Sequence, residues 1–152
     1  MAKTSAGVLL YRWRDAELEV LLVHPGGPFF VGKDAGAWSI PKGEYEAGED
    51  PLTAALREFN EEIGCDPGSA EPRELGQVKQ ASGKIVSAWA IHGDCDADAI
   101  HSNSFSMEWP PRSGKMRQFP EVDRAAWFSV DAARGKMNPA QCAFLDRLAD
   151  MF

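Results

Sequence analysis

One short stretch, residues 50–64, constrains the fold most, because it has the pattern of an amphipathic helix with both ends marked. Asp50 can cap the helix, Pro51 suits its first position, and Gly64 is a natural stop. Between these ends, apolar side chains recur at the helical period and fall in one sector. The sequence therefore predicts a helix whose buried face consists of Leu52, Ala55, Leu56, Phe59 and Ile63.

The same helix gathers like charges. Glu58 lies three residues before Glu61 and four before Glu62, so the three carboxylates can converge on the side away from the apolar sector. Each like-charged pair at this spacing costs roughly 0.2–0.5 kcal/mol, and negative charge is unfavourable in the last turn of a helix. An acidic, solvent-facing helix is one interpretation. A site for Mg²⁺ or Mn²⁺ is the other, because hard cations prefer oxygen ligands.

The chain as a whole is acidic, with a net charge of −7 over 152 residues. Such a chain is poorly suited to follow a long phosphate backbone, so a nucleic-acid polymer is not expected as a partner. An anionic small molecule is compatible with the charge if a cation neutralises the carboxylates. Nothing near the N-terminus resembles a signal peptide or a membrane span, which favours a soluble, cytoplasmic protein.

Length and composition predict a single domain over residues 1–152, because the hydrophobic fraction of 44% is ordinary for a globular protein. The three cysteines form no CxxC pair, and the three histidines form no HxxxH or HExxH array. Zinc is therefore not expected, and the thiols are interpreted as reduced.

The order of the expected elements favours an α/β fold with a mixed or antiparallel sheet. A doubly wound parallel sheet fits poorly, because strands and helices do not alternate along the chain. Besides the glutamate-rich helix, the patterns predict strands at 6–13, 18–23, 38–40 with an extension into 41–43, 75–80, 85–91, 105–109 and 125–128, and helices at 130–136 and 138–149. Residues 14–17 can turn, so the first two strands are expected to form a hairpin.

A lysine and a glycine stand just ahead of the acidic helix. Lys42 can meet a phosphate group, and Gly43 lets the backbone approach a metal or ligand closely. Glu49, near the helix start, lies within reach of Arg57.

Taken together, residues 43–65 resemble the Nudix box, GX5EX7REUXEEXGU. The two U positions prefer aliphatic residues and here hold Phe59 and Cys65, which are still apolar. The resemblance implies the Nudix fold, an α/β/α sandwich around a mixed sheet, and hydrolysis of a nucleoside diphosphate linked to another group. Every fixed position of the box is matched, by Gly43, Glu49, Arg57, Glu58, Glu61, Glu62 and Gly64.

The resemblance also implies roles for these residues. Glu58, Glu61 and Glu62 would be ligands of Mg²⁺ or Mn²⁺, with the main-chain carbonyl of Lys42 as a further candidate. One of the three glutamates would act as the general base, and the pattern does not say which. Arg57 and Glu49 would form a supporting pair that fixes the carboxylates.

A later acidic residue completes the expected site. Residues 121–127 resemble the Glu-x5-Trp stretch of dinucleoside tetraphosphate hydrolases. Glu121 is therefore the first candidate for an additional metal ligand and catalytic residue, and Glu108 is the second.

The substrate is indicated less directly. Residues 38–43, WSIPKG, are similar to the corresponding stretch of diadenosine polyphosphate hydrolases. Residues 112–117 are basic and suit either an extra phosphate or a solvated loop. Some Nudix subgroups carry a tyrosine at a position that here corresponds to residues 81–83, Ala-Ser-Gly, and others a proline where Gln80 stands, so neither residue is present at its position. A dinucleoside polyphosphate or a nucleoside triphosphate is favoured, and the candidates for stacking on its base are Trp38, Trp89, Phe105 and Trp109.

Two other functions stay open. The domain could be a nucleotide-binding sensor without catalysis, although the intact glutamate set argues against this. An isopentenyl diphosphate isomerase-like reaction would need an additional cysteine or histidine array that the sequence lacks. For the favoured function, we expect hydrolysis to require Mg²⁺ or Mn²⁺ and an alkaline pH.

Overall fold

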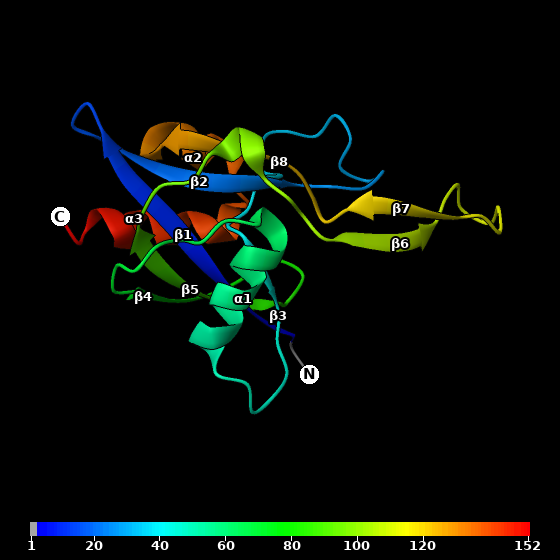
Figure 1. The fold of residues 1–152 in the computed structure, drawn as a ribbon, viewed down its shortest axis with the longest axis horizontal. Helices are drawn as coiled ribbons and strands as arrows, with labels where there is room; N and C mark the ends of the chain where they lie inside the picture. Colours follow the sequence, from blue (N-terminus) through cyan, green and yellow to red (C-terminus); the bar gives the residue numbers. More distant parts are fainter. Residues whose placement is uncertain (1–2) are drawn as a thin grey trace.

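The computed structural model describes residues 3–152, so the first two residues of the predicted 1–152 domain lie outside it. The centre of the molecule is a six-stranded mixed sheet (Figure 1). Its strands are β1 (Thr4–Arg14), β2 (Glu17–Pro25), β3 (Lys42–Glu44), β4 (Arg73–Lys79), β5 (Ile85–His92) and β8 (Val122–Ser129). Their order is β4-β5-β1-β2-β8, with β3 paired to β1. Of these pairings, β1 with β5 is parallel and the others are antiparallel, so the predicted mixed sheet is confirmed.

Side chains of the central strands alternate between two cores, as the period of two in a strand requires. In β1, Val8 and Leu10 face one core, whereas Leu9 and Tyr11 face the other. Helix α1 (Pro51–Ile63) covers the first face, and helices α2 (Val130–Lys136) and α3 (Cys142–Ala149) cover the second (Figure 1). The predicted α/β/α sandwich is therefore confirmed.

Helix α1 begins and ends where the sequence predicts. The Asp50 side chain accepts a hydrogen bond from the Thr53 backbone N–H at 3.0 Å, and Gly64 ends the helix with a left-handed φ of 72°. A residue with a side chain would be strained at that φ, so glycine suits the position.

The buried face of α1 differs from the predicted one. Ala54 is fully buried, whereas the predicted Leu52 and Leu56 are only half-buried. Ala54 begins a row at four-residue spacing that continues with Glu58 and Glu62, and both glutamates are half-buried rather than solvent-facing. The prediction that they lie opposite the apolar sector was wrong. The part of the helix surface that packs against the rest of the protein is wider than the sector of apolar side chains, and it includes Glu58 and Glu62.

The predicted hairpin of the first two strands, the two strands after α1, and the helix at 130–136 are all present. The predicted strand 38–40 is reduced to isolated bridges of Trp38 and Ser39. The last predicted helix begins with a short 3-10 turn, Pro139–Gln141, before α3. No helix within residues 3–152 is both long and apolar enough to cross a bilayer.

One strand was missed altogether. Strand β7 (Met116–Pro120) pairs with β6 (Ser104–Glu108) as a separate antiparallel ribbon. Figure 1 shows this ribbon projecting from the body of the molecule, and we call residues 104–120 the arm. The strand was missed because Arg117 and Gln118 interrupt the apolar pattern, and because no core lies behind the ribbon to impose one.

Candidate active site

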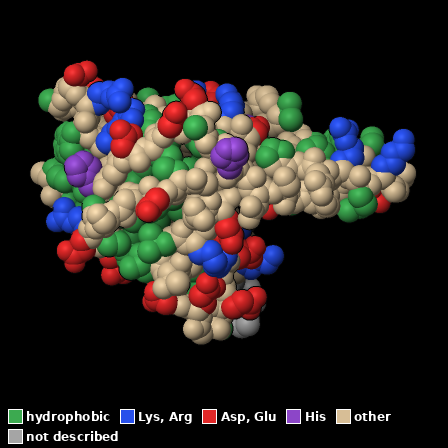
Figure 2. Space-filling model, in the orientation of Figure 1, with side chains coloured by type: hydrophobic (Ala, Val, Ile, Leu, Met, Phe, Trp, Pro, Cys, Tyr) green, Lys and Arg blue, Asp and Glu red, His purple; other side chains and the backbone are tan. Residues whose placement is uncertain are grey.

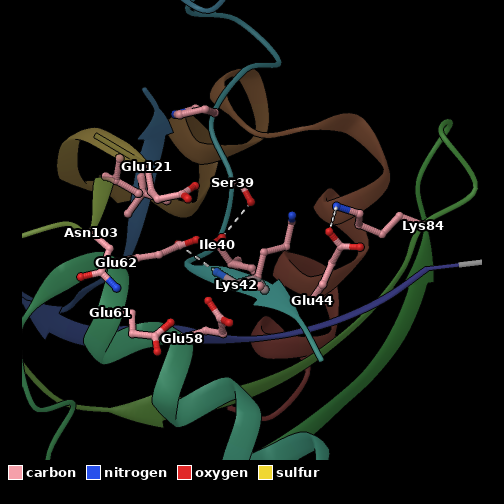
Figure 3. A pocket seen from close by; sticks show the side chains of 14 residues that line it. Ser39, Ile40, Lys42, Glu44, Glu58, Glu61, Glu62, Lys84, Asn103 and Glu121 are labelled. Carbon is pink, nitrogen blue, oxygen red and sulfur yellow. Dashed lines mark hydrogen bonds and ion pairs between the residues drawn. The ribbon is translucent and has the colours of Figure 1, made fainter. Parts of the chain in front are cut away.

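A cavity of about 430 Å³ lies between β3, α1 and the start of β8 (Figure 3). All four carboxylates that the sequence nominates first as metal ligands line it: Glu58, Glu61, Glu62 and Glu121. Lys42 and Gly43 line it too, so the structure brings together most of the predicted site. The other lining residues are Val23, Pro25, Ser39, Ile40, Glu44, Lys84, Asn103 and Val122.

Strand β3 passes directly over Glu58, and this close approach explains Gly43. A Cβ atom at Gly43 would lie 2.0 Å from the Glu58 carboxyl carbon. The neighbouring Lys42 backbone N–H donates a hydrogen bond of 3.1 Å to Glu62 Oε2. The backbone of β3 therefore lies against two of the glutamates at once, and a side chain at Gly43 would displace the Glu58 carboxylate from its position.

The segment before β3 is held on two sides. Ser39 exchanges backbone hydrogen bonds with Val23, at 2.9 and 3.0 Å. The Ile40 N–H donates to the side-chain oxygen of Gln141, which is fully buried, and the Gln141 amide donates to Ser39 Oγ, both at 3.0 Å. These bonds fix the wall of the cavity from which Lys42 emerges.

Backbone bonds also link Glu121 to the end of α1. The Glu121 N–H donates to the Asn103 carbonyl at 2.8 Å, and the Asn103 N–H donates to the Glu61 carbonyl at 3.0 Å. On its other side, the Glu121 carbonyl accepts from Gly26 N–H at 2.9 Å. Glu121 is thus held opposite the helix by main-chain contacts, although it lies about sixty residues away in sequence.

Glu62 has the most strongly perturbed carboxyl group. Its pKa is raised to about 8, mainly by burial and in smaller part by the negative charges of Glu58 and Glu121. The hydrogen bond from the Lys42 N–H and the Lys42 charge oppose this rise without cancelling it. A cation placed beside Glu62 would remove the cost of ionising it.

Glu58 and Glu61 are partly neutralised by Arg57. The Arg57 guanidinium donates to Glu58 Oε1 at 2.9 Å and to Glu61 Oε2 at 3.5 Å. Burial and the charge of Glu61 nevertheless raise the pKa of Glu58 above its usual value. The cluster therefore remains electrostatically strained even with Arg57 in contact.

Arg57 and Glu49 lie outside the cavity. They form an ion pair in which Arg57 donates three hydrogen bonds of 3.1–3.2 Å to the Glu49 carboxylate. The pairing agrees with the supporting function that the sequence suggests. Neither residue lines the cavity, so their assignment as catalytic residues stays a prediction, and their geometry fits the supporting pair that the resemblance implies.

Lys84 is a cavity residue that the sequence analysis missed. It comes from the turn before β5, and its Nζ lies 4.0 Å from Glu44 Oε2 (Figure 3). The pKa of Lys42 is lowered by burial and then by the positive charge of Lys84. No local pattern connects Lys84 to the box; only the parallel pairing of β1 with β5 brings it there.

Several other candidates lie elsewhere. Glu108, the second choice for the additional acid, is in the arm and does not line the cavity. None of the aromatic side chains predicted to stack on a base lines the cavity either. Trp38 is buried in the core with α2 and α3, and Trp89 packs against the core under α1.

The donor set suits a hard divalent cation, because it consists of carboxylates around a buried group that is costly to ionise. Within residues 3–152, no three His, Cys, Asp or Glu side chains are already close enough together to hold a metal ion. Arg57 donates hydrogen bonds to two of the four carboxylates, Glu58 and Glu61. Binding a cation would therefore require the carboxylates to move closer together.

The comparisons with known proteins agree with this geometry. The model of the NUDIX domain family matches residues 1–148. The chain belongs to the NUDIX family. Its box residues lie on β3, in the turn before α1, on α1 and at its C-terminal cap, and Glu58, Glu61 and Glu62 line the cavity.

Two curated NUDIX relatives are similar over part of their length. An RNA pyrophosphohydrolase of Roseobacter denitrificans is 46% identical over 56 residues, which are 34% of this chain and 35% of that protein. The asymmetrical bis(5′-nucleosyl)-tetraphosphatase of Sus scrofa is 31% identical over 100 residues, 59% of this chain and 64% of that protein. The matches thus span about a third and just under two thirds of these relatives.

Solved structures share the fold over the whole chain. A Caenorhabditis elegans Ap4A hydrolase in a binary complex aligns with a TM-score of 0.68 and 21% identity, covering 99% of this chain and 97% of that one. The NUDIX domain of Shewanella oneidensis NrtR, complexed with ADP ribose, aligns with a TM-score of 0.64 and 16% identity, covering 99% and 88%. At these identities the likeness shows the fold alone.

Proposed function

We propose that this NUDIX chain is a pyrophosphohydrolase that acts as a single domain over residues 1–152. It cleaves the pyrophosphate linkage of a nucleoside diphosphate joined to another group, with a dinucleoside polyphosphate or a nucleoside triphosphate as the favoured substrate. The observation that carries the proposal is the convergence of Glu58, Glu61, Glu62 and Glu121 on one cavity that also holds two lysines.

The four carboxylates would hold Mg²⁺ or Mn²⁺, with the Lys42 carbonyl as the further candidate ligand. Such a cation, when bound, offsets the negative charge of the diphosphate and makes phosphorus easier to attack by water. Without it, the carboxylates would repel the substrate. The dependence on a divalent cation therefore follows from the charge of the cavity itself.

The residues of the chain then divide the remaining tasks. Lys42 and Lys84 bind phosphate oxygens from the side of the cavity opposite α1, which orients the diphosphate. One carboxylate of the cluster accepts the proton from the attacking water. Arg57 and Glu49 keep the row of glutamates in position from the outer side of the helix.

A nucleotide-binding domain without catalysis is the second candidate. It is favoured by one observation, that Arg57 already pairs with Glu58 and Glu61 while the carboxylates are not spaced to hold an ion. In this alternative the arginine replaces the cation permanently, and nucleotide binds without being cleaved.

A substrate panel tests the proposal. Diadenosine polyphosphates, nucleoside triphosphates, ADP-ribose and diphosphoinositol phosphates are incubated with Mg²⁺ or Mn²⁺, and the products are identified by mass spectrometry. We expect cleavage of a nucleotide substrate that stops when the metal is chelated and is lost in Glu61→Gln. Metal-independent release that Glu61→Gln leaves unaltered, or no cleavage despite nucleotide binding, would support the domain without catalysis.

A further inference from the structure

The arm is a two-stranded ribbon that stands apart from the main sheet. Strand β6 pairs with β7 and with no other strand among residues 3–152, and Figure 1 shows both strands extending away from the body. A ribbon of only two strands is barely stable in water on its own. The loop after β2 covers one face of the arm, since a Cβ atom at Gly27 would meet the Phe105 ring at 3.0 Å. That loop adds no strand, so the edges of the ribbon are left for further pairing.

The hydrogen bonds of the ribbon show which backbone groups lie on its edges. The Trp109 N–H donates to the Lys115 carbonyl at 2.9 Å, and the Glu121 N–H donates to the Asn103 carbonyl at 2.8 Å. In an antiparallel pair, every second residue faces the partner strand in this way and the residues between them face outward. The residues whose N–H and C=O groups point outward from β6 are therefore Ser104, Ser106 and Glu108. Within residues 3–152, none of them has a backbone hydrogen bond to a segment outside the ribbon.

The outer edge of β7 is protected against pairing. By the same alternation, Pro120 occupies an outward position of β7, and proline has no N–H to donate. Lys115 and Arg117 add positive charge along this strand. Proline and charged side chains are two of the means by which proteins prevent an edge strand from pairing with another chain.

The edge of the main sheet at β4 is protected in a different way. The Arg147 guanidinium donates hydrogen bonds to the Leu75 and Gln77 carbonyls, at 2.9 and 3.0 Å, and so occupies acceptors that another strand would need. Strand β6 has neither kind of protection. Each of its outward residues keeps its N–H, and its one charged side chain is that of Glu108. The open edge of β6 is therefore a surface on which a further strand can pair.

The sequence of β6 suits antiparallel pairing with a second copy of itself. With a two-fold axis at Ser106, this residue lies opposite its own counterpart. Ser104 then lies opposite Glu108 of the second copy, and Phe105 lies opposite Met107 of the second copy. The outward backbone groups of both strands pair, which gives about six hydrogen bonds. No two like charges face each other in this register.

Charge favours the same arrangement. Arg112 and Lys115 lie in the loop that joins β6 to β7, at the free end of the arm. Figure 2 shows basic side chains toward this end and acidic ones spread over the body. Antiparallel pairing brings each free end beside the residues that precede β6 in the other copy. Those residues include the exposed Asp96 and Asp98, so opposite charges meet.

We propose that the outer edge of β6 is an interaction surface for a second copy of this chain. The two β6 strands pair antiparallel about a two-fold axis at Ser106, and the two ribbons become one four-stranded sheet. The free end of each arm lies against the acidic surface of the other copy. The inference goes beyond the proposed function, because it concerns assembly and needs no cleavage of any substrate.

Sedimentation velocity over a range of micromolar concentrations tests the pairing. Wild type is expected to sediment as a dimer. Ser106→Pro removes one outward N–H from β6 without removing a hydrogen bond of the ribbon, and it is expected to sediment as a monomer. Gln118→Pro is the matched control, because Gln118 lies directly opposite Ser106 and its N–H also points outward, but from β7. This control is expected to remain a dimer.

A cysteine substitution tests the register. The Cα atoms of a hydrogen-bonded antiparallel pair are about 5.5 Å apart, which is within the range of a disulfide. Ser106→Cys is therefore expected to link to its counterpart on mild oxidation and to give a covalent dimer on a non-reducing gel. Gln118→Cys and the wild type, which has three free cysteines of its own, are the controls and should show no such dimer.

A charge reversal tests the contact of the free end. In Arg112→Glu/Lys115→Glu, the dissociation constant of the dimer is expected to rise at least about tenfold, because the tip then repels the acidic surface of the other copy. Arg73→Glu/Lys79→Glu reverses two exposed charges on β4 and is the matched control. It should leave the dissociation constant unchanged.

Three results would overturn the inference. The first is a wild-type protein that remains a monomer at every concentration. The second is a dimer that Ser106→Pro leaves intact, which would place the interface elsewhere. The third is a dimer that both proline variants abolish, together with no disulfide in Ser106→Cys, which would show that the edge of β6 is not what pairs. All of these measurements are made without substrate, so their outcome is independent of the cleavage that the substrate panel tests.

Discussion

The cavity and the arm are adjacent in the structure but are built in opposite ways. Every wall of the cavity is tied to the body by backbone hydrogen bonds, and its key carboxylate, Glu62, is buried enough to have a strongly raised pKa. The arm is paired only with itself, and none of its residues is fully buried. The chain thus places reactive groups on a rigid frame and leaves an adaptable surface beside them.

The largest expected effect contrasts the core under α1 with the arm. Phe59→Ala should lower the free energy of unfolding by about 3–5 kcal/mol, because Phe59 is fully buried and its removal leaves a cavity. Phe105→Ala, in the half-buried arm, should cost about 1 kcal/mol or less. Urea unfolding of both variants measures the difference. Equal losses would show that the arm is part of the cooperative core.

The next effect concerns the buried carboxylate. Glu62→Gln keeps the size of the side chain but removes its charge, and kcat/KM with Mg²⁺ should fall at least about 100-fold. Glu74→Gln, at an exposed position of β4, is the control and should keep wild-type activity. A Glu62→Gln enzyme within a few-fold of wild type would remove this residue from the proposed site.

The two candidates for the additional acid separate the cavity from the arm. Glu121→Gln should reduce kcat/KM about 10- to 100-fold, because Glu121 faces the other carboxylates. Glu108→Gln should change it less than about threefold, since Glu108 lies at the far end of β6. Steady-state kinetics on one small nucleotide is sufficient. The reverse order of effects would contradict the placement of the site.

The stability of the metal-free protein should depend on pH through Glu62. Its folded-state pKa of about 8 lies above the usual value of 4.5, so the folded protein binds this proton more tightly than the unfolded chain does. The associated stability is therefore present at low pH and is lost as pH rises from about 5 through 8, by on the order of 1–3 kcal/mol. Thermal melts across this range in EDTA measure it. Glu62→Gln should be flatter, and a wild-type curve with the same slope as the variant would contradict the assignment.

The smallest effect is expected from removing the arm. Replacing residues 105–119 by Asn-Gly joins the paired positions Ser104 and Pro120 through a tight turn. Stability should change by less than about 1 kcal/mol, and activity on a nucleoside triphosphate should persist. A loss of that activity would mean that the arm helps to build the cavity.

The glutamate-rich helix could be predicted well because its signals are local. Asp50, Pro51 and Gly64 mark its ends. Glu58, Glu61 and Glu62 are three and four residues apart, and side chains at this spacing lie side by side in any helix. The error concerned orientation. Whether Glu62 faces solvent or the cavity depends on β3 packing beside it, and a helical wheel has no information about a neighbouring strand.

The parts that could not be predicted depend on distant pairings. Lys84 reaches the cavity only because β5 lies parallel to β1, and Glu121 reaches it through Asn103 and the end of α1. Strand β7 was missed because its residues do not pack against a core, so its sequence does not show the alternation of apolar and polar side chains that identifies a strand. Resemblance to a known family nominated Glu121 where physical patterns alone gave no reason to choose it.

The central claim is that the carboxylates of the cavity bind a divalent cation that then attracts a diphosphate. Electron paramagnetic resonance of free Mn²⁺ tests it most directly, because the signal of the free ion decreases on binding. Wild-type protein should remove Mn²⁺ from solution saturably, and more tightly when a nucleotide is present, whereas Glu58→Gln/Glu62→Gln should not. Identical free-Mn²⁺ signals for wild type and this variant, with and without nucleotide, would contradict the claim.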